Sequence, residues 1–271
     1  MPELPEVETT CRGISPHIID SRIHKVALRN SNLRWPVLKS IVKTLSGLLV
    51  VSVQRRGKYI LINLETGCLI IHLGMSGSLR IVTVGTAPEK HDHFDLCLNT
   101  GRVLRYRDPR RFGSIHWTTT DPGFHPLLRN LGPEPLTRSF TGSYLFKKSR
   151  NKTRAIKTFI MDGCIVAGIG NIYANEALFD SGILPSKRAG KLSKKQYENL
   201  VFSIKKILKK SILKGGSTLR DFVGGDGEPG YFQQTLSIYG RAGMPCKTCQ
   251  RPLQSKVLNQ RATYYCNFCQ H

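Results

Sequence analysis

Two pairs of cysteines near the C-terminus constrain the fold of this 271-residue chain more than any other feature. The four residues are Cys246, Cys249, Cys266 and Cys269. Two close thiolate pairs around a hairpin-length insert are typical of a tetrahedral Zn²⁺ site whose four positions are all filled by the protein. A catalytic zinc or an iron–sulfur cluster fits this pattern less well. We predict one structural Zn²⁺ that folds a small β-hairpin.

The charge of the chain restricts the class of partner. Forty-one Lys and Arg residues against eighteen Asp and Glu residues give a formal net charge of +23. Such an excess predicts a polyanionic partner, with nucleic acid as the first candidate. An anionic membrane surface is the alternative, but the basic residues are dispersed and no long basic amphipathic helix is evident. Without a signal peptide or a bilayer-length apolar run, we expect a cytoplasmic protein and no membrane contact. We also expect a monomer.

The period of the apolar residues changes along the chain. Residues 22–118 alternate short apolar runs with turn signals, which predicts β-structure. A segment rich in Pro and Gly at 121–135 predicts a linker. Helical periodicity follows, with helices expected near residues 139–148, 153–160, 171–181 and 193–213. We therefore predict an α+β fold: an N-terminal β-sandwich domain with a helix at its start (1–130), a helical domain (131–240) and a zinc hairpin (241–271).

The N-terminus, MPELPEVE, offers a reactive amine. A small second residue usually permits removal of Met1, which would leave Pro2 as a secondary amine. Such an amine keeps a neutral fraction near pH 7 and condenses with a sugar aldehyde to an iminium. Glu3 and Glu6 are then available as proton carriers. The alternative interpretation, compatible with the first, is a capped amphipathic helix with Pro5 in its first turn.

These opening residues resemble the formamidopyrimidine-DNA glycosylase family of bacteria, which removes oxidised purines from DNA. The resemblance implies that Pro2 attacks the sugar, that Glu3 assists ring opening and later proton transfers, and that Glu6 orients the terminus. It also implies that Lys58, in the run RRGKY, contacts the phosphate and the sugar of the damaged nucleotide. From the residues alone, this basic run could be a solvated strand edge.

Two further motifs, HLGMSG and DPRRFG, suggest how the hole left by an extruded base is filled. A glycosylase takes its target base out of the stack. Met75 can protrude from a turn between glycines, Arg110 can donate to the orphaned base, and Phe112 can stack beside it. Either motif alone is also typical of core packing plus a turn. Together they match the three-part void filler of the resembled family.

The remaining candidates concern the DNA backbone. A glycine-rich loop precedes Asn171, which we expect to be the N-cap of the next helix, where a phosphate would fit. The loop resembles the helix-two-turn-helix element of the family, which implies that Asn171 holds the DNA backbone. On the zinc hairpin, Arg261 is implied to enter the minor groove and grip phosphates. Lys157 and His91 are further candidates for DNA contact, and the loop at 217–231 is implied to close over the extruded base.

We therefore predict a bifunctional glycosylase and abasic-site lyase that acts in the bacterial cytoplasm on the nucleoid. Its partner would be double-stranded DNA with 8-oxoguanine, ring-opened purines or abasic sites, cleaved through a Pro2 iminium by β- and δ-elimination. A non-catalytic DNA-binding protein would explain the charge and the zinc site equally well. The Nei-type branch, which prefers oxidised pyrimidines, is a closer alternative, although Leu4 and the DPRRFG run favour the purine branch.

Overall fold

The computed structural model describes residues 1–216 and 236–271. The described chain forms two compact units: unit 1 holds residues 1–129 with 214–216, and unit 2 holds residues 130–213 with 236–271. Within these ranges, no helix combines the length and the apolar character that a membrane span needs. The loop predicted to close over the base, 217–231, lies outside the described residues.

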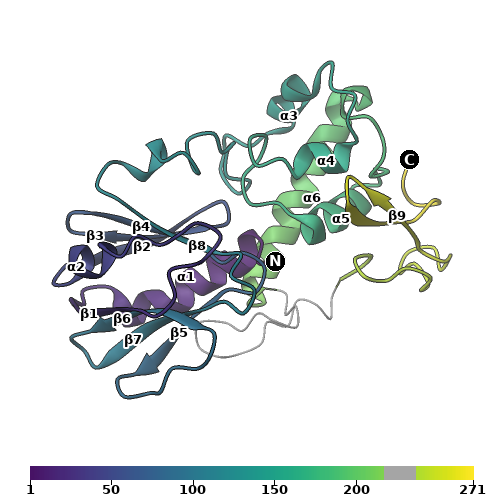
Figure 1. Cartoon of the computed structure of the whole chain (residues 1–271). Helices are drawn as coiled ribbons and strands as arrows, with labels where there is room; N and C mark the ends of the chain where they lie inside the picture. The colour runs from purple at the N-terminus through teal and green to yellow at the C-terminus, as the bar shows by residue number, and fades with distance from the viewer. Residues whose placement is uncertain (217–235) are drawn as a thin grey trace. The chain divides into compact units, whose positions relative to one another are not determined.

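Unit 1 contains two antiparallel four-stranded sheets (Figure 1). The first has the order β1-β6-β7-β5, with strands Ile23–Leu28, Asp92–Leu98, Arg102–Arg107 and Ser78–Thr83. The second has the order β2-β3-β4-β8, with strands Val50–Arg56, Tyr59–Leu64, Gly67–His72 and Ser114–Thr118. The predicted hairpin across Asn99 and Gly101 is confirmed, with Leu96 opposite Leu104.

The first helix is part of the core of unit 1. Helix α1 spans Leu4–Ile18 and buries Val7, Cys11 and Ile14, which lie on one face, against side chains of both sheets. A short helix, α2 at Ile41–Leu45, adds to the same core. Because the apolar face of α1 is fixed by this burial, the start of the helix has a defined position in unit 1.

Unit 2 is helical, as predicted. Its described part contains the α-helices α3 (Gly142–Ser149), α4 (Ile156–Ile160), α5 (Asn171–Asp180) and α6 (Lys194–Leu213). Two of them begin three residues later than expected. Helix α3 starts after Thr141, whose Oγ1 accepts a hydrogen bond from the Tyr144 N–H at 3.1 Å as an N-cap. Helix α4 starts after Ala155 because the backbone there pairs with Arg188 in an isolated bridge.

A two-stranded hairpin completes unit 2, and short 3₁₀ helices occur in each unit at Pro122–Phe124 (η1) and Ala189–Lys191 (η2). The hairpin pairs β9 (Gln254–Leu258) with β10 (Arg261–Tyr265). Both residues of its turn, Asn259 and Gln260, have positive φ (49° and 58°), as a tight two-residue hairpin turn requires. One cysteine pair precedes β9 and the other follows β10, so the predicted α+β fold with a cysteine-flanked hairpin is confirmed.

Candidate active site and nucleic-acid interface

The predicted nucleophile and both predicted proton carriers lie at the start of α1. Pro2, Glu3 and Glu6 are buried there. Glu3 and Glu6 form a reciprocal capping box, in which the Glu3 N–H donates to Glu6 Oε2 at 2.9 Å. The positive end of the helix dipole stabilises negative charge at this position. Met1, whose removal would free the Pro2 nitrogen, is 39% exposed.

Lys58 lies in the turn between β2 and β3. Gly57 beside it adopts φ +58°, a conformation that favours glycine. Arg55 connects the turn to α1, because its Nε donates to Glu8 Oε2 at 3.0 Å and its Nη1 donates to the Gly57 carbonyl at 3.0 Å. The turn that carries Lys58 is therefore fastened to the helix that begins beside Pro2.

His72, at the end of β4, shapes the turn that presents Met75. Burial lowers the pKa of His72, and the positive charges of Lys58 and Arg34 lower it further, to about 4. The neutral Nδ1 accepts a hydrogen bond from the Gly74 N–H at 3.0 Å. Gly74 has φ +63°, and a Cβ there would lie 2.4 Å from a backbone nitrogen of the neighbouring loop. Only glycine fits this close approach.

The three predicted void fillers protrude from two neighbouring loops. Met75 is 40% exposed and Phe112 is 45% exposed, so both apolar side chains are accessible from solvent. Arg110 lies over the Phe112 ring, with its guanidinium carbon 4.8 Å from the ring centroid. This cation–π contact keeps the donor and the aromatic side chain together.

A buried carboxylate, that of Asp108, joins the two loops. Asp108 Oδ1 accepts a hydrogen bond from Ser76 Oγ at 2.7 Å, which anchors the Met75 loop. Asp108 Oδ2 accepts from the Gly113 N–H at 2.8 Å and from the Tyr106 hydroxyl at 3.1 Å. Ser76 Oγ also accepts from the Arg110 N–H at 3.2 Å. With three donors on one buried carboxylate, both loops share a single fixed anchor.

His91 lies next to the same anchor. Its carbonyl accepts a hydrogen bond from the Asp108 N–H at 3.0 Å. Its ring centroid is 6.4 Å from that of His93, whose Nε2 is 2.9 Å from the Asp108 carbonyl oxygen and so carries the proton. Unit 1 therefore groups the void fillers and His91 around Asp108.

In unit 2, two predicted DNA-contact residues converge on the hairpin next to Arg261. Lys157 Nζ donates to the Ala262 carbonyl at 2.8 Å and to Thr263 Oγ1 at 2.6 Å. Asn171 Nδ2 donates to the same Ala262 carbonyl at 3.1 Å. Lys157 is only 1% exposed, so its ammonium group anchors the hairpin. Direct DNA contact by Lys157 stays a prediction.

The start of α5 differs from the sequence-based expectation. Gly170 is the N-cap and Asn171 is the first helical residue, so the predicted N-cap role of Asn171 is wrong. An extended glycine occupies the cap, and the Asn171 side chain reaches the hairpin instead. Asn175 strengthens this connection, since its Oδ1 accepts from the Tyr264 N–H at 2.9 Å and its Nδ2 donates to the Asn171 carbonyl at 2.6 Å.

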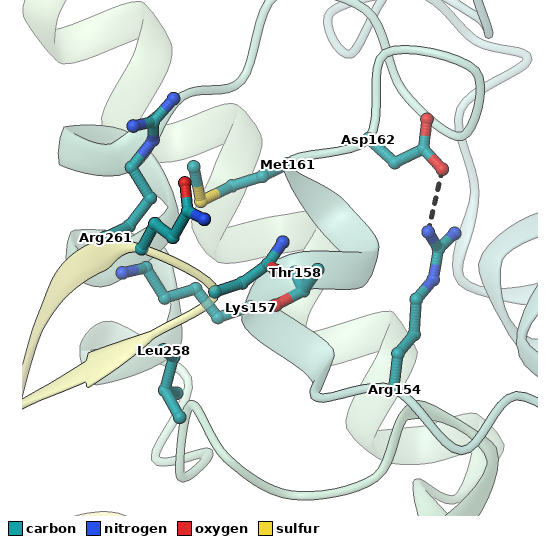
Figure 2. A pocket seen from close by; sticks show the side chains of 9 residues that line it. Arg154, Lys157, Thr158, Met161, Asp162, Leu258 and Arg261 are labelled. Carbon is teal, nitrogen blue, oxygen red and sulfur yellow. Dashed lines mark hydrogen bonds and ion pairs between the residues drawn. The ribbon is translucent and has the colours of Figure 1, made fainter.

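A cavity of about 470 Å³ lies between α4 and the tip of the hairpin. Figure 2 shows Lys157 and Thr158 on α4, with Arg261 on the hairpin and Arg154 near Asp162. Arg154 Nη1 is paired with Asp162 Oδ2 at 2.8 Å. Lys157 and Arg261 add two positive charges to the lining, and Asp162 is the only carboxylate among the described residues that line it. The cavity is therefore electropositive and suits an anion.

The four C-terminal cysteines form one cluster. Their Sγ atoms all lie within 4.8 Å of one another, with 3.9 Å between Cys246 and Cys269 and 3.5 Å between Cys249 and Cys266. Zn–S bonds of about 2.3 Å in a tetrahedral site separate the sulfurs by about 3.8 Å. The donor set and its spacing therefore fit one Zn²⁺ ion, with a thiolate at each of its four coordination positions.

Three residues that support the site were not predicted from the sequence. Asp108 anchors the loops of unit 1, and the Asp-Pro turn of DPRRFG is the one signal that could have identified it. Glu176 of α5 accepts three backbone hydrogen bonds at 2.8–2.9 Å from the segment 237–239. Gln270 accepts from the Cys266 N–H at 2.8 Å and donates to the Ile183 carbonyl at 2.8 Å. The partners of Glu176, and the Ile183 carbonyl that Gln270 reaches, are distant in sequence, so no local pattern marks these contacts.

Comparison with known proteins gives a consistent result over the whole chain. Two family models match: the formamidopyrimidine-DNA glycosylase N-terminal domain at residues 1–115 and the formamidopyrimidine-DNA glycosylase H2TH domain at residues 131–223. The formamidopyrimidine-DNA glycosylases of Pseudomonas putida (strain W619) and Cellvibrio japonicus are each 55% identical over 270 residues, covering 100% of both chains.

Solved structures agree with the sequence comparison. The MutM (Fpg) protein of Thermus thermophilus matches with a TM-score of 0.89 and 36% identity, covering 99% of this chain and 98% of that one. A Lactococcus lactis Fpg bound to abasic-site DNA matches with a TM-score of 0.91 and 33% identity, covering 99% of each chain. A variant of the same Lactococcus protein bound to Fapy-dG DNA matches with a TM-score of 0.92. This chain belongs to the formamidopyrimidine-DNA glycosylase family.

Proposed function

We propose that this chain is a bifunctional enzyme of base-excision repair, a DNA glycosylase with abasic-site lyase activity on oxidised purines in duplex DNA. The observation that carries the proposal is the start of α1, where Pro2 lies beside two buried carboxylates in a capping box. Removal of Met1 would free the Pro2 nitrogen as a secondary amine. Carboxylates at that place can hold and move protons around the amine.

The proposed chemistry begins with attack of the Pro2 lone pair on the sugar C1'. The glycosidic bond breaks, and its electron pair leaves with the base, which takes up a proton. Glu3 assists opening of the sugar ring, which gives a cationic iminium between Pro2 and C1'. The iminium accepts electrons when a C2' proton leaves and the 3' phosphate departs, and a second elimination releases the 5' phosphate. Glu6 orients the terminus through its hydrogen bond to the Glu3 N–H.

Lesion access depends in this proposal on the loops of unit 1. Met75 and Phe112 protrude, and Arg110 is held over Phe112, as expected for groups that replace an extruded base. Their shared anchor on Asp108 supports a common action. Lys58 would bind the phosphate and the sugar of the damaged nucleotide, and His91 would bind the DNA backbone.

Unit 2 would grip the DNA backbone. We assign phosphate contacts to Arg261 and to the start of α5, and we assign to Lys157 the support of Arg261 through the Ala262 carbonyl. The electropositive cavity beside the hairpin supports this assignment. One Zn²⁺ held by the four cysteines would supply folding energy to the hairpin and take no part in the chemistry. Metal analysis of the purified protein should give one equivalent of zinc.

Covalent trapping tests the proposal. We expect the protein without Met1 to be trapped by borohydride on a duplex with a single 8-oxoguanine, because the iminium is reduced to a stable amine. Protein that retains Met1 is the matched control, and it should bind the duplex without being trapped. A processed protein that binds but cannot be trapped would show that the chain is a DNA-binding protein without lyase chemistry.

A second substrate class has one specific observation in its favour. A wild-type Lactococcus lactis Fpg that matches this chain at 33% identity was solved with DNA containing an oxidised pyrimidine. A panel of duplexes with 8-oxoguanine, a ring-opened purine or an oxidised pyrimidine separates the two classes. We expect faster excision of the purines, and a clear preference for the pyrimidine would assign the chain to Nei-type chemistry.

A further inference from the structure

A buried cluster of guanidinium and carboxylate groups in sheet β1-β6-β7-β5 has no role in the chemistry described above. At its centre is Arg105 on β7, which is 3% exposed. Arg105 Nε donates to Asp95 Oδ1 at 3.1 Å, its Nη2 donates to Asp95 Oδ2 at 2.9 Å, and its Nη1 is 3.6 Å from Asp92 Oδ2. Arg80 on β5 donates to both carboxylate oxygens of Asp92, at 3.0 and 2.9 Å.

Buried ion pairs contribute little net stability, because desolvation of the charges offsets their attraction, but they can fix geometry. The useful question is therefore which backbone the cluster holds. Two further hydrogen bonds give the answer: Arg105 Nη1 donates to the Ala87 carbonyl at 3.1 Å, and Nη2 donates to the Thr86 carbonyl at 3.0 Å. Asp92 Oδ2 accepts from the Glu89 N–H at 2.8 Å. The cluster thus binds the segment 86–91 at three points.

Besides these bonds, the segment is held by an ion pair between Glu89 and Arg107 and by a hydrogen bond between the Thr83 and Thr86 hydroxyl groups. Every residue from 83 to 90 is exposed, so none of these side chains contributes to a core. The segment ends at His91, whose carbonyl accepts the Asp108 N–H at 3.0 Å. Its backbone is therefore held on one side by Arg105 and Asp92 and on the other by the anchor of the lesion-facing loops.

We propose that Arg105 and Asp92 are positioning residues, which hold the segment 86–91 so that His91 presents its imidazole to the DNA backbone. The proposal rests on the DNA-contact role assigned to His91 above. Arg105 touches no DNA and acts through the backbone of the segment. A flexible segment would have to become ordered on every binding event, and the conformational entropy lost in that ordering would weaken the affinity for DNA.

A double-mutant cycle on duplex affinity tests this role. His91→Ala should weaken binding of an 8-oxoguanine duplex about tenfold, as expected for one hydrogen bond to a charged phosphate. Arg105→Lys keeps the charge but lacks the forked donors, and it should weaken binding to a similar extent. The double variant should bind no worse than His91→Ala alone, because Arg105 acts only through His91. Losses that add in the double variant would overturn the positioning role.

The cycle also distinguishes the DNA contact assigned to His91 from the positioning role proposed for Arg105. Unchanged affinity in His91→Ala would overturn the DNA-contact assignment itself, whereas a loss in His91→Ala that Arg105→Lys fails to reproduce would overturn only the positioning role. Arg22→Gln is the matched control, since this exposed arginine pairs with Glu65 at 3.3 Å and should leave affinity unchanged.

Local order gives a second readout. Amide hydrogen exchange in residues 86–91 should accelerate in Arg105→Lys while the rest of unit 1 keeps its protection. If Arg105→Lys proves too unstable to purify, Arg80→Gln perturbs the same Asp92 from a more exposed side chain and enters the same cycle. Unchanged exchange in 86–91 together with native affinity in the substituted protein would refute the proposal.

Discussion

The loops of unit 1 and the hairpin of unit 2 present their functional side chains by different means. In unit 1, hydrogen bonds to one buried carboxylate, that of Asp108, hold the loops that carry Met75 and Phe112. In unit 2, a cysteine cluster fixes the base of the hairpin, while Lys157 and Asn171 hold its backbone beside Arg261. A small hairpin buries little core of its own and would gain folding energy from the proposed Zn²⁺, whereas the loops use the core of the sandwich.

The difference implies that the two regions can be disabled independently. The proposed chemistry and base replacement belong to unit 1, and the proposed grip on the DNA backbone belongs largely to unit 2. Variants that attack one region should leave the fold of the other intact. The predictions below test this independence.

The largest expected effect is a loss of strand scission when Pro2 is substituted. Pro2→Gly keeps a terminal amine but makes it primary, so its adduct with C1' is cationic only when protonated, and strand scission should fall by about a thousandfold. Affinity for a lesion duplex should stay within about threefold, because the phosphate contacts remain. Scission of an abasic-site duplex and a binding titration measure the two effects. Pro5→Ala, one turn along the same helix, is the control and should keep its lyase activity.

The next effect concerns the hairpin. Cys249→Ser removes one thiolate, so zinc should be lost and duplex affinity should fall by about 100-fold, or about 2.7 kcal/mol. Far-ultraviolet circular dichroism should show the remaining secondary structure intact. Cys164→Ser is the matched control, since this cysteine is exposed and outside the cluster. Arg261→Ala should keep one equivalent of zinc and still lose affinity. Full affinity after verified zinc loss would show that the hairpin serves stability alone.

A smaller effect on DNA binding is expected from Phe112, the aromatic member of the predicted void fillers. Phe112→Ala should weaken binding to a lesion duplex by about 30-fold, because one base–aromatic stack contributes about 1–3 kcal/mol. Its melting temperature should hardly change, since the ring is 45% exposed. Phe124→Ala removes another exposed ring of unit 1, 76% exposed, and should leave affinity unchanged. Equal losses in both variants would mean that the effect reflects surface hydrophobicity and not base replacement.

The smallest effect is a pH dependence of stability. The folded state holds the pKa of His72 at about 4, below its ordinary value of 6.5. As pH falls, His72 is protonated in the unfolded chain before it is protonated in the folded chain. The stability that depends on neutral His72 is therefore complete above pH 6.5 and is lost as pH falls from 6.5 to 4. From about pH 7.5 to about pH 5.5 we expect His72 alone to contribute a loss of about 1 kcal/mol. Urea unfolding at both pH values should show this loss reduced in His72→Gln and unchanged in His24→Gln, an exposed control.

Much of the fold follows from the sequence because its signals are local. The alternation in residues 22–118, the helical period after 139 and the cysteine spacing each depend on neighbouring residues. The supporting contacts do not. Asp108 reaches Ser76 across 32 positions, and Lys157 reaches Thr263 across 106. Lys157 is one example, since only the folded chain shows that this predicted DNA-contact residue also anchors the hairpin.

The residues at both ends of the described chain are built into its structure. Glu3 donates its N–H to Glu6 in the cap of α1, and His271 donates its N–H to the Gly182 carbonyl at 2.9 Å. A fusion partner before Pro2 would acylate the proposed nucleophile. Fluorescent or affinity labels therefore belong in an exposed segment away from the N-terminus, such as the turn around Thr100.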